Sequence, residues 1–391
     1  MMFRIQTLNK ISSRGLELFP RDTYEVASEL PNPDAILVRS ADMHDIELPQ
    51  TVKAIARAGA GYNNIPVARC SDRGVVVFNT PGANANAVKE LTIASLFVSS
   101  RNVFGGLQWS ASIADKADEI PDLVEKGKSN FEGPEIRGKT LGVIGLGAIG
   151  VAVANDAISL GMDVIGFDPY ISVDAAWNLS RQVVRAETLE GLLAKADYIT
   201  LHLPLADSTK GVIDAEKIRH MKKGARLINL ARGALVNETD LIAALNAEKL
   251  SCYITDFPSA ELLACKRALC IPHLGASTPE AEENCAIMAV QQLIDFLETG
   301  SIKNSVNFPR CHLDQRTLFR LLVVNRNIPN MVGQITTILA ETGVNIADLI
   351  NHHRDDYAYN IIDTEQEIPV DVMERILGVN GIIRVRAIRH E

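Results

Sequence analysis

Apolar and polar positions alternate along this chain in two distinct rhythms. Short runs rich in β-branched and other apolar residues predict buried strands, and longer segments with apolar residues at helical spacing predict amphipathic helices. A regular alternation of the two is typical of parallel α/β sheets. The expected strands are residues 35–38, 53–56 and 75–78 in a first unit, and 141–144, 164–167, 198–201, 226–230, 252–256 and 269–271 in a second.

Two long helical segments, residues 85–98 and 279–297, flank the second unit. Helices at both ends of one unit suit a chain that enters this unit and afterwards returns to the first. We therefore expect a split first domain made of residues 1–98 and 280–305, and a continuous second domain made of residues 99–279. Both are expected to be doubly wound parallel-sheet domains.

The pattern changes after residue 300. Residues 301–316 lack apolar periodicity and include Pro309, which predicts a linker. Residues 317–391 then follow the order strand, helix, strand, strand, helix, strand. The expected elements are residues 318–324, 330–341, 344–350, 357–362, 370–377 and 382–388. This βαββαβ order predicts a ferredoxin-like module.

The clearest chemical motif spans residues 140–168. An apolar strand leads into Gly145-Leu146-Gly147-Ala148-Ile149-Gly150, and a second apolar run ends at Asp168. The glycines permit a tight turn, close approach of a pyrophosphate and close packing of helix on strand, while the helix N-terminus donates N–H groups to phosphates. A carboxylate at the second strand end holds ribose hydroxyls and repels the 2′-phosphate of NADP. The motif predicts a Rossmann-like domain that binds NAD through Gly145, Gly147, Ala148, Ile149, Gly150 and Asp168.

Composition narrows the choice of partners. The chain has 391 residues, enough for two or three domains, and its net charge of −9 argues against nucleic acid or a membrane surface as the main ligand. No apolar run approaches the roughly 20 residues that cross a bilayer, and no signal-peptide pattern is present, so a cytoplasmic protein is expected. The six cysteines include no C-x-x-C pair, so reduced thiols and no metal site are expected.

Three polar side chains follow successive strands of the second domain. Arg232, Glu261 and His273 come after the strands at 226–230, 252–256 and 269–271. Ligands of open parallel sheets bind outside the carboxyl ends of the strands, so these side chains are expected to lie near one another. A guanidinium suits a carboxylate, and an imidazole can accept a proton from an alcohol. Each residue alone is more often a surface or structural residue, but together they predict an active site.

These motifs resemble the signature blocks of the D-isomer-specific 2-hydroxyacid dehydrogenases. The blocks are residues 229–233 (Asn-Leu-Ala-Arg-Gly), 256–258 (Asp-Phe-Pro) with Glu261, and 272–277 (Pro-His-Leu-Gly-Ala-Ser), and the resemblance spans roughly the first 310 residues. Residues 38–40 (Val-Arg-Ser), 79–84 (Asn-Thr-Pro-Gly-Ala-Asn) and 343–346 (Gly-Val-Asn-Ile) are similar to those of members that act on 3-phosphoglycerate and carry a C-terminal ACT domain.

The resemblance implies a role for each candidate residue. Arg232 would bind and polarise the carboxylate and C2 oxygen of the substrate, and His273, oriented by Glu261, would accept the C2 hydroxyl proton as hydride passes to NAD. The substrate contacts implied by the resemblance are Arg39, Ser40 and Asn84 for the phosphate and the backbone at Ala60 and Gly61 for the carboxylate. The further cofactor contacts are Pro204, Ala231, Asp256 and His273.

The region between Glu261 and His273 departs from the family pattern. His273 follows Glu261 by 12 positions, a shorter loop than is common in the family. A shorter loop is expected to remodel the mouth of the cofactor cleft while leaving the catalytic pair within reach of each other.

The C-terminal module departs from the family pattern as well. Asn330 stands where the family has glycine at the start of the first helix, and Asn325 stands where a histidine is often found, while Asn327 and Asn345 match the effector-binding positions. The resemblance therefore implies an L-serine effector held by Asn327 and Asn345, and a homo-oligomer, a dimer or tetramer. A purely structural oligomerisation module is the alternative.

Two other functions are compatible with these motifs. A reductase of an unphosphorylated 2-keto acid, such as glyoxylate or hydroxypyruvate, would keep the three residues at the strand ends but would not need Arg39, Ser40 and Asn84. An NAD-sensing regulatory protein of the corepressor type would reuse the fold without turnover. The resemblance favours NAD-dependent oxidation of D-3-phosphoglycerate to 3-phosphohydroxypyruvate, the first step of the phosphorylated route to L-serine.

Overall fold

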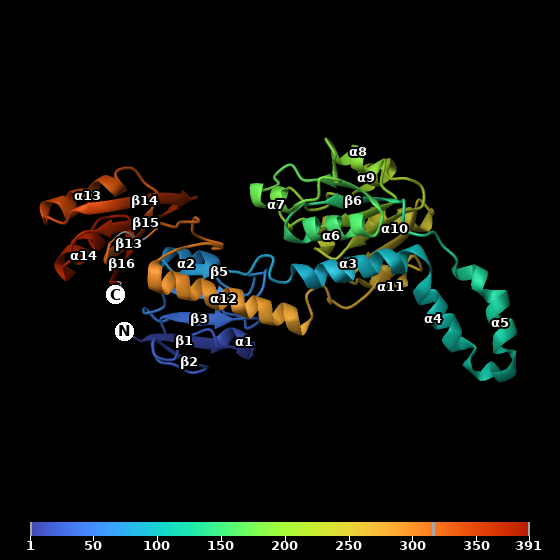
Figure 1. Ribbon diagram of the computed structural model, residues 1–391, viewed down its shortest axis with the longest axis horizontal. Helices are drawn as coiled ribbons and strands as arrows, with labels where there is room; N and C mark the ends of the chain where they lie inside the picture. The colour runs from blue at the N-terminus through green and yellow to red at the C-terminus, as the bar shows by residue number, and fades with distance from the viewer. Residues whose placement is uncertain (1, 315–316, 390–391) are drawn as a thin grey trace. The chain divides into compact units, whose positions relative to one another are not determined.

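The computed structural model describes residues 2–314 and 317–389 (Figure 1). Contacts divide the chain into two compact units, one made of Met1–Asn84 and Pro279–Glu391 and the other of Ala85–Thr278. The helix that follows residue 84 packs on the sheet of the second unit, whereas the sequence placed the domain boundary after residue 98. Among the described residues, none of the helices combines the length and hydropathy of a membrane span.

Unit 1 is built on a five-stranded parallel sheet, sheet A, with the strand order β2-β1-β3-β4-β5. Helices α1 and α12 cover one face and α2 covers the other, so the sheet is doubly wound. Its elements are β1 (Phe3–Leu8), α1 (Ser13–Leu16), β2 (Tyr24–Ala27), β3 (Ala35–Val38), β4 (Ala54–Arg57), α2 (Val67–Asp72), β5 (Val76–Phe78) and α12 (Pro279–Thr299).

Unit 2 is built on a seven-stranded parallel sheet, sheet B, with the order β12-β11-β10-β9-β6-β7-β8. Helices α3 and α6 pack on one face and α8, α9 and α10 on the other. The strand order reverses between β6 and β9, and a reversal of this kind opens a crevice for a ligand. The strands are β6 (Thr140–Ile144), β7 (Asp163–Phe167), β8 (Val184–Arg185), β9 (Tyr198–Leu201), β10 (Ala225–Asn229), β11 (Leu250–Thr255) and β12 (Ala268–Cys270). The helices that pack on them are α3 (Ala85–Ser100), α6 (Ala148–Ser159), α7 (Val173–Asn178), α8 (Leu189–Leu193), α9 (Ala215–His220), η3 (Gly233–Leu235), α10 (Glu238–Asn246) and α11 (Ala260–Ala264).

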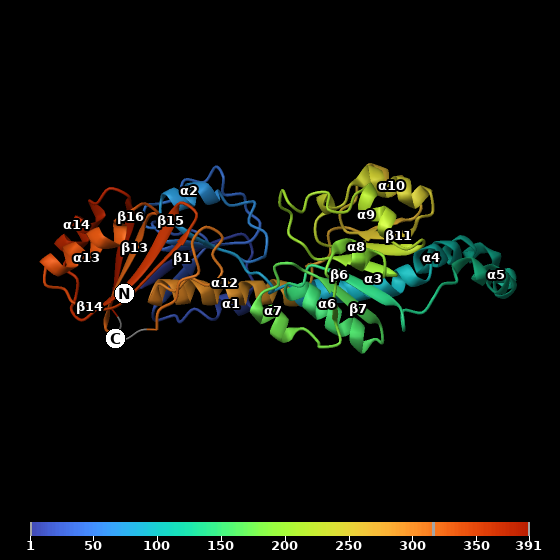
Figure 2. The ribbon, with the colours of Figure 1, turned by 90° about the horizontal axis from the view of Figure 1, so that it is seen from above.

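A helical hairpin that the sequence did not predict links α3 to β6. It comprises α4 (Val103–Ser112), η1 (Ala114–Glu119), α5 (Ile120–Gly127) and η2 (Lys128–Phe131). Both views show α4 and α5 extending away from the strands of sheet B (Figure 1, Figure 2). The rings of Trp109 and Phe131 pack 5.5 Å apart inside the hairpin, while Leu107 is 62% exposed. The hairpin therefore presents apolar side chains to solvent.

The C-terminal module forms sheet C, an antiparallel sheet with the order β14-β15-β13-β16. The predicted βαββαβ order is confirmed, as is the prediction of two doubly wound parallel sheets. Helices α13 and α14 cover one face. The elements are β13 (Phe319–Arg326), α13 (Met331–Glu341), β14 (Ile346–Arg354), β15 (Tyr357–Thr364), α14 (Val370–Leu377) and β16 (Ile382–Arg389).

The second face of sheet C packs into the core of unit 1. Leu322 and Tyr359 on this face belong to the same buried cluster as Phe296 and Leu297 of α12. The hydroxyl of Tyr359 also donates to the carbonyl of Gly300 at 2.8 Å. The module thus completes the hydrophobic core beside α12 rather than being connected to it by a linker alone.

A buried ion pair joins the middle strands of sheet C. Arg320 donates from Nε and Nη2 to the two carboxylate oxygens of Asp363 at 2.7 and 3.0 Å, and their side chains are 1% and 0% exposed. The same guanidinium donates to the carbonyls of Thr299 and Leu313 at 2.9 and 3.0 Å. Arg320 therefore holds together β13, β15, the end of α12 and the segment before sheet C.

We expect Arg320→Leu to lower the free energy of unfolding by about 3–5 kcal/mol, because the substitution leaves the Asp363 charge buried without its main partner. Urea denaturation followed by circular dichroism measures the change. The matched control is Arg375→Leu, which removes an exposed pair with Glu341 at 2.7 Å and should cost about 1 kcal/mol or less. Equal losses in the two variants would contradict the assignment.

Candidate active site

The glycine turn between β6 and α6 has the geometry of a dinucleotide cradle. Gly145 has φ 91°, and a Cβ on Gly150 would lie 1.9 Å from the carbonyl oxygen of Gly145, so neither position accommodates a side chain. A Cβ on Gly147 would meet nothing within 4 Å. The exposed backbone at Gly147 and Ala148, at the N-terminus of a 12-residue helix, can therefore receive a phosphate.

Asp168 follows β7 and is fixed by backbone donors. Its Oδ2 accepts from the N–H of Leu146 at 2.8 Å, and its Oδ1 accepts from the N–H of Tyr170 at 2.8 Å. The carboxylate thus lies beside the glycine turn in the place where a ribose is bound in such domains. The remaining lone pairs on its oxygens are available for the two hydroxyls of a ribose.

The segment after β9 forms another wall beside the glycine turn. The carbonyl oxygen of His202 lies 2.7 Å from the place where a Cβ of Gly145 would be, and Pro204 follows two residues later on the surface. Burial lowers the pKa of His202 to about 4, and its Nδ1 has no hydrogen-bond partner among the described residues. His202 is therefore neutral near pH 7 and places no additional charge next to the phosphate-binding turn.

The Arg232 loop at the end of β10 is shaped by a buried asparagine that sequence reasoning did not identify as functional. Asn229 is 0% exposed, and its Oδ1 accepts from the N–H groups of Ala231 and Arg232 at 3.2 and 3.3 Å. Its Nδ2 donates to the carbonyl of Arg232 at 2.9 Å. Both ends of the amide thus hold the turn. The Arg232 side chain is exposed, and its Nη1 donates to the carbonyl of Ala231 at 2.6 Å.

Asp256 ties the end of β11 to the loop after β12. Its Oδ2 accepts from the N–H of Gly275 at 3.1 Å. The residue is 0% exposed, and its Oδ1 has no hydrogen-bond partner among the described residues. A buried carboxylate oxygen without a donor is unusual, and it fits a site that a ligand N–H group completes.

His273 lies on the surface after β12, with its ring packed against Phe257 at a centroid distance of 4.8 Å. Glu261 is exposed in the first turn of α11. Ser259 caps this helix by accepting from the N–H of Leu262 at 3.1 Å, and it donates to Glu238 at 2.7 Å. No hydrogen bond or ion pair joins Glu261 to His273 among the residues that the structure describes. The short loop places both residues near one edge of sheet B, with α11 packed against β12, the strand that precedes His273.

The predicted phosphate contacts Arg39 and Ser40 follow β3 in unit 1. The N–H groups of Ser40 and Ala41 both donate to Oδ1 of Asn9, at 3.2 and 2.5 Å. Asn9 comes directly after β1 and has φ 68°. The side chain of Arg39 donates from Nη2 to Glu282 Oε1 of α12 at 2.5 Å. Its guanidinium is thus already engaged by a carboxylate.

The remaining predicted substrate residues occupy neighbouring loops of unit 1. The carbonyl of Ala60 accepts from Nδ2 of Asn79 at 2.7 Å, and the space around Gly61 is open apart from Asn63. Asn84 is half-buried and immediately precedes α3. Arg57, which the sequence reasoning missed, ends β4 and donates to the carbonyl of Arg39 at 3.0 Å. The sequence did offer one sign of Arg57: a basic residue ends β4, the strand that pairs with β3 just before Arg39.

The predicted effector residues lie at opposite ends of sheet C within one chain. Asn327 follows β13 and donates from Nδ2 to the carbonyl of Asp355 at 3.1 Å. Asn345 precedes β14, and its N–H donates to Gln366 at 3.0 Å. The strand register puts these positions beside the two opposite ends of β15. A single site formed by both asparagines would therefore need a second copy of the module.

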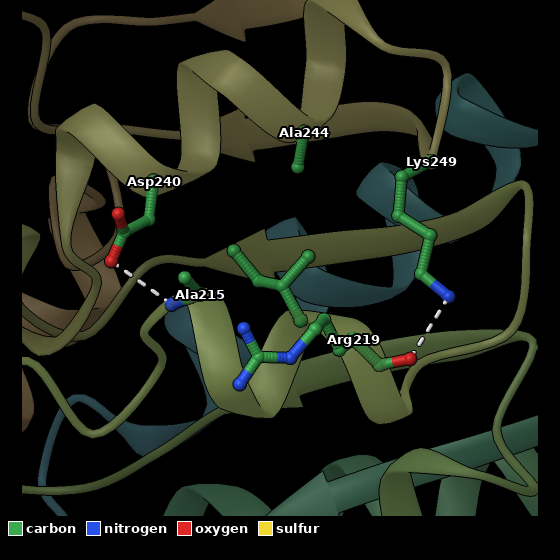
Figure 3. A pocket seen from close by; sticks show the side chains of 6 residues that line it. Ala215, Arg219, Asp240, Ala244 and Lys249 are labelled. Carbon is green, nitrogen blue, oxygen red and sulfur yellow. Dashed lines mark hydrogen bonds between the residues drawn. The ribbon is translucent and has the colours of Figure 1, made fainter.

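A surface pocket of about 330 Å³ on unit 2 lies in the groove between α9 and α10 (Figure 3). Oδ2 of Asp240 accepts there from the N–H of Ala215 at 2.9 Å, and Lys249 donates to the carbonyl of Arg219 at 3.1 Å. None of the predicted catalytic or cofactor residues lines it. The pocket is therefore separate from the candidate active site.

The chain is similar in sequence to known dehydrogenases. Residues 107–275 match the family model for the D-isomer specific 2-hydroxyacid dehydrogenase, NAD binding domain. A D-3-phosphoglycerate dehydrogenase of Methanocaldococcus jannaschii is 34% identical over 335 residues, which is 83% of this chain and 61% of the relative. Another from Bacillus subtilis is 32% identical over 332 residues, covering 80% of this chain and 61% of the relative. The chain thus spans about three fifths of the length of these relatives.

Solved structures share the fold. An NAD⁺-bound 3-phosphoglycerate dehydrogenase of Entamoeba histolytica aligns with 28% identity and a TM-score of 0.61, over 78% of this chain and 98% of that chain. The apo form of D-mandelate dehydrogenase from Rhodotorula graminis aligns with 23% identity and a TM-score of 0.64, over 78% and 98% of the two chains.

We expect Asp168→Asn to reduce the preference for NAD over NADP by about 10-fold or more, because the neutral amide no longer repels a 2′-phosphate. Fluorescence titration with each dinucleotide measures the two dissociation constants. Asp174→Asn, at an exposed carboxylate in the first turn of α7, is the control and should leave the ratio unchanged. Equal affinity of the unmodified protein for NAD and NADP would refute the assignment.

Proposed function

We propose that the protein is an NAD-dependent D-2-hydroxyacid dehydrogenase, because residues 107–275 match the family model for the D-isomer specific 2-hydroxyacid dehydrogenase, NAD binding domain. Its proposed reaction is the oxidation of D-3-phosphoglycerate to 3-phosphohydroxypyruvate, the first step of the phosphorylated route to L-serine. The observation that carries the proposal is the presence of the glycine turn, Asp168, Arg232 and His273 along the carboxyl edge of one parallel sheet.

The residues of unit 2 fit NAD. The open backbone at Gly147 and Ala148 would hold the pyrophosphate, and Asp168 would hold the adenosine ribose. The unpartnered Oδ1 of Asp256 suits the amide of the nicotinamide. Pro204 and Ala231 lie at the ends of the strands between these two positions. When bound, NAD supplies the hydride acceptor.

Arg232 and His273 would handle the reacting end of the substrate. The exposed guanidinium of Arg232 can form paired hydrogen bonds with the substrate carboxylate and C2 oxygen. His273, packed on Phe257, would accept the proton from the C2 hydroxyl as the C2 hydrogen leaves with its electron pair. Asn229 is a positioning residue, because its side chain sets the backbone of the Arg232 loop.

Glu261 remains the proposed partner of His273. Hydrogen bonds between catalytic groups are often long before substrate binds and tighten in the reacting complex. A carboxylate beside the imidazole would stabilise its protonated form once the substrate proton has been accepted. In this chain α11 packs against β12, the strand that leads into the loop of His273.

In unit 1, Arg39, Ser40 and Asn84 are the proposed contacts of the substrate phosphate, and the backbone at Ala60 and Gly61 the proposed contact of its carboxylate. The relatives named D-3-phosphoglycerate dehydrogenase, at 32–34% identity, support this choice of substrate. The nearest alternative, a reductase of unphosphorylated 2-keto acids, would gain nothing from a guanidinium at position 39.

The deciding assay follows NADH absorbance with 3-phosphoglycerate, glycerate and 2-oxoglutarate in parallel. The proposal expects oxidation of 3-phosphoglycerate to be the most efficient of the three. A preference for unphosphorylated hydroxy acids would indicate the reductase. Tight NAD binding with no turnover on any substrate would indicate an NAD-sensing protein.

We expect His273→Gln to lower kcat for 3-phosphoglycerate by about 100-fold or more, since a positioned acid–base group contributes roughly 100- to 10,000-fold. The NAD dissociation constant, measured by fluorescence, should change little, because glutamine keeps a polar side chain of similar reach. His220→Gln, at an exposed histidine at the end of α9, is the control. Retention of full turnover in His273→Gln would exclude His273 as the proton acceptor.

We further propose that the protein is a homo-oligomer and that sheet C responds to L-serine. The α4–α5 hairpin supports self-association, because it exposes Val103, Phe104 and Leu107 along one segment. The opposite placement of Asn327 and Asn345 within one module supports an effector site completed by a second copy. Sheet C presents β14 and β16 as its edge strands, and edge strands are able to pair with another chain.

Under this proposal, millimolar L-serine inhibits the unmodified protein, and Asn345→Ala raises the inhibitory concentration by about 10-fold, the cost of one lost hydrogen bond to a charged ligand. Initial rates at fixed substrate measure the effect, and sedimentation of the same samples gives the oligomeric state. Asn178→Ala, in unit 2, is the control. If serine leaves the unmodified protein fully active, the module is structural only.

A further inference from the structure

A pocket of about 310 Å³ lies at the carboxyl edge of sheet A, entirely within unit 1. Its walls include Lys10 after β1, Arg39 after β3 and Ala58 after β4. The opposite wall is the first part of α12, which contributes Glu282 and Glu283. The pocket therefore brings two cations and two carboxylates together around the arginine that we assign to the substrate phosphate.

The two carboxylates have different partners. Glu282 accepts a hydrogen bond from Arg39 Nη2 at 2.5 Å, and their side chains are 44% and 39% exposed. Glu283 instead lies 3.6 Å from Arg14, outside the pocket lining. Lys10 forms no ion pair among the described residues. Among the described residues, Glu282 is thus the acidic partner of Arg39, and it engages Nη2 of the guanidinium that a substrate phosphate would need.

The charge of the substrate phosphate determines how it affects the Arg39–Glu282 ion pair. A phosphate monoester carries about −1.5 to −2 charges near pH 7. A phosphate that binds the Nη2 side of Arg39 displaces the Glu282 carboxylate, which then remains nearby as a like charge. An exposed ion pair is weak enough to be displaced in this way.

We infer that Glu282 is a specificity-determining residue that competes with the substrate phosphate for Arg39. This inference rests on the proposed function and adds to it a residue that weakens phosphate binding. With the site empty, Glu282 holds the guanidinium within the pocket. When a phosphate arrives, Glu282 releases Arg39, and Lys10 on the opposite wall is the cation expected to receive the displaced carboxylate. A substrate without a phosphate leaves the pair intact.

The test is Glu282→Gln, which keeps a hydrogen-bond acceptor for Arg39 but removes the competing charge. We expect the KM for 3-phosphoglycerate to fall about five-fold, the equivalent of a weak exposed ion pair, with kcat little changed. The KM for glycerate should stay within about two-fold, because glycerate has no phosphate. Glu280→Gln is the matched control, an exposed carboxylate in the first turn of α12 that does not line the pocket.

A binding measurement separates this inference from the proposed activity. Calorimetric titration with inorganic phosphate should give a dissociation constant about five-fold lower for Glu282→Gln than for the unmodified protein and for Glu280→Gln. Unchanged or weaker phosphate binding in folded Glu282→Gln, verified by its melting temperature, would overturn the inference. If the unmodified protein fails to oxidise 3-phosphoglycerate, the proposed function fails, and the phosphate titration still decides whether Glu282 competes for Arg39.

Discussion

The close approach of α6 to β6 is the constraint on which the candidate site depends. Gly150 lies so near the carbonyl of Gly145 that any side chain would force the helix away from the sheet. Held at this distance, the turn exposes the backbone at Gly147 and brings the N–H of Leu146 to Asp168. One contact thus fixes the phosphate cradle and the ribose carboxylate together, and the ends of the neighbouring parallel strands add Arg232 and His273 along the same edge.

The hydrophobic pattern of the sequence predicted the fully buried strands, because burial on both faces leaves an uninterrupted apolar run. The order of the C-terminal elements predicted the βαββαβ module. Strands β1 and β2 escaped notice because most of their residues are only partly buried. The α4–α5 hairpin was also missed: α4 buries none of its residues, and α5 buries only Gly127. The ion pair between Arg39 and Glu282 joins residues 243 positions apart, so only the folded sheet brings it about. No hydrogen bond joins Glu261 to His273 among the described residues, so their pairing stays a prediction.

Two of the carboxylate–arginine pairs of unit 1 show how burial changes the role of an ion pair. Between Arg320 and Asp363 the charges are sealed from water, and two further carbonyls satisfy the guanidinium, so the pair fixes the fold. Water reaches both Arg39 and Glu282, so separating this pair costs little free energy. Such a pair suits a site that must admit an anion.

Helix α12 runs from the Arg39–Glu282 contact to the part of unit 1 that packs against sheet C. Its 21 residues form a rod about 30 Å long, with Glu282 in its first turns and Phe296 near its end, where the carbonyl of Phe296 accepts a hydrogen bond from Arg386 of β16. A rod converts a small rotation at one end into a displacement at the other. Glu282 lies about 21 Å along the helix from Phe296, so a tilt of about 5° about the Phe296 contact would move Glu282 by roughly 2 Å, enough to stretch a hydrogen bond beyond its normal length. A shift of α12 at sheet C can therefore strengthen or weaken the hydrogen bond between Glu282 and Arg39.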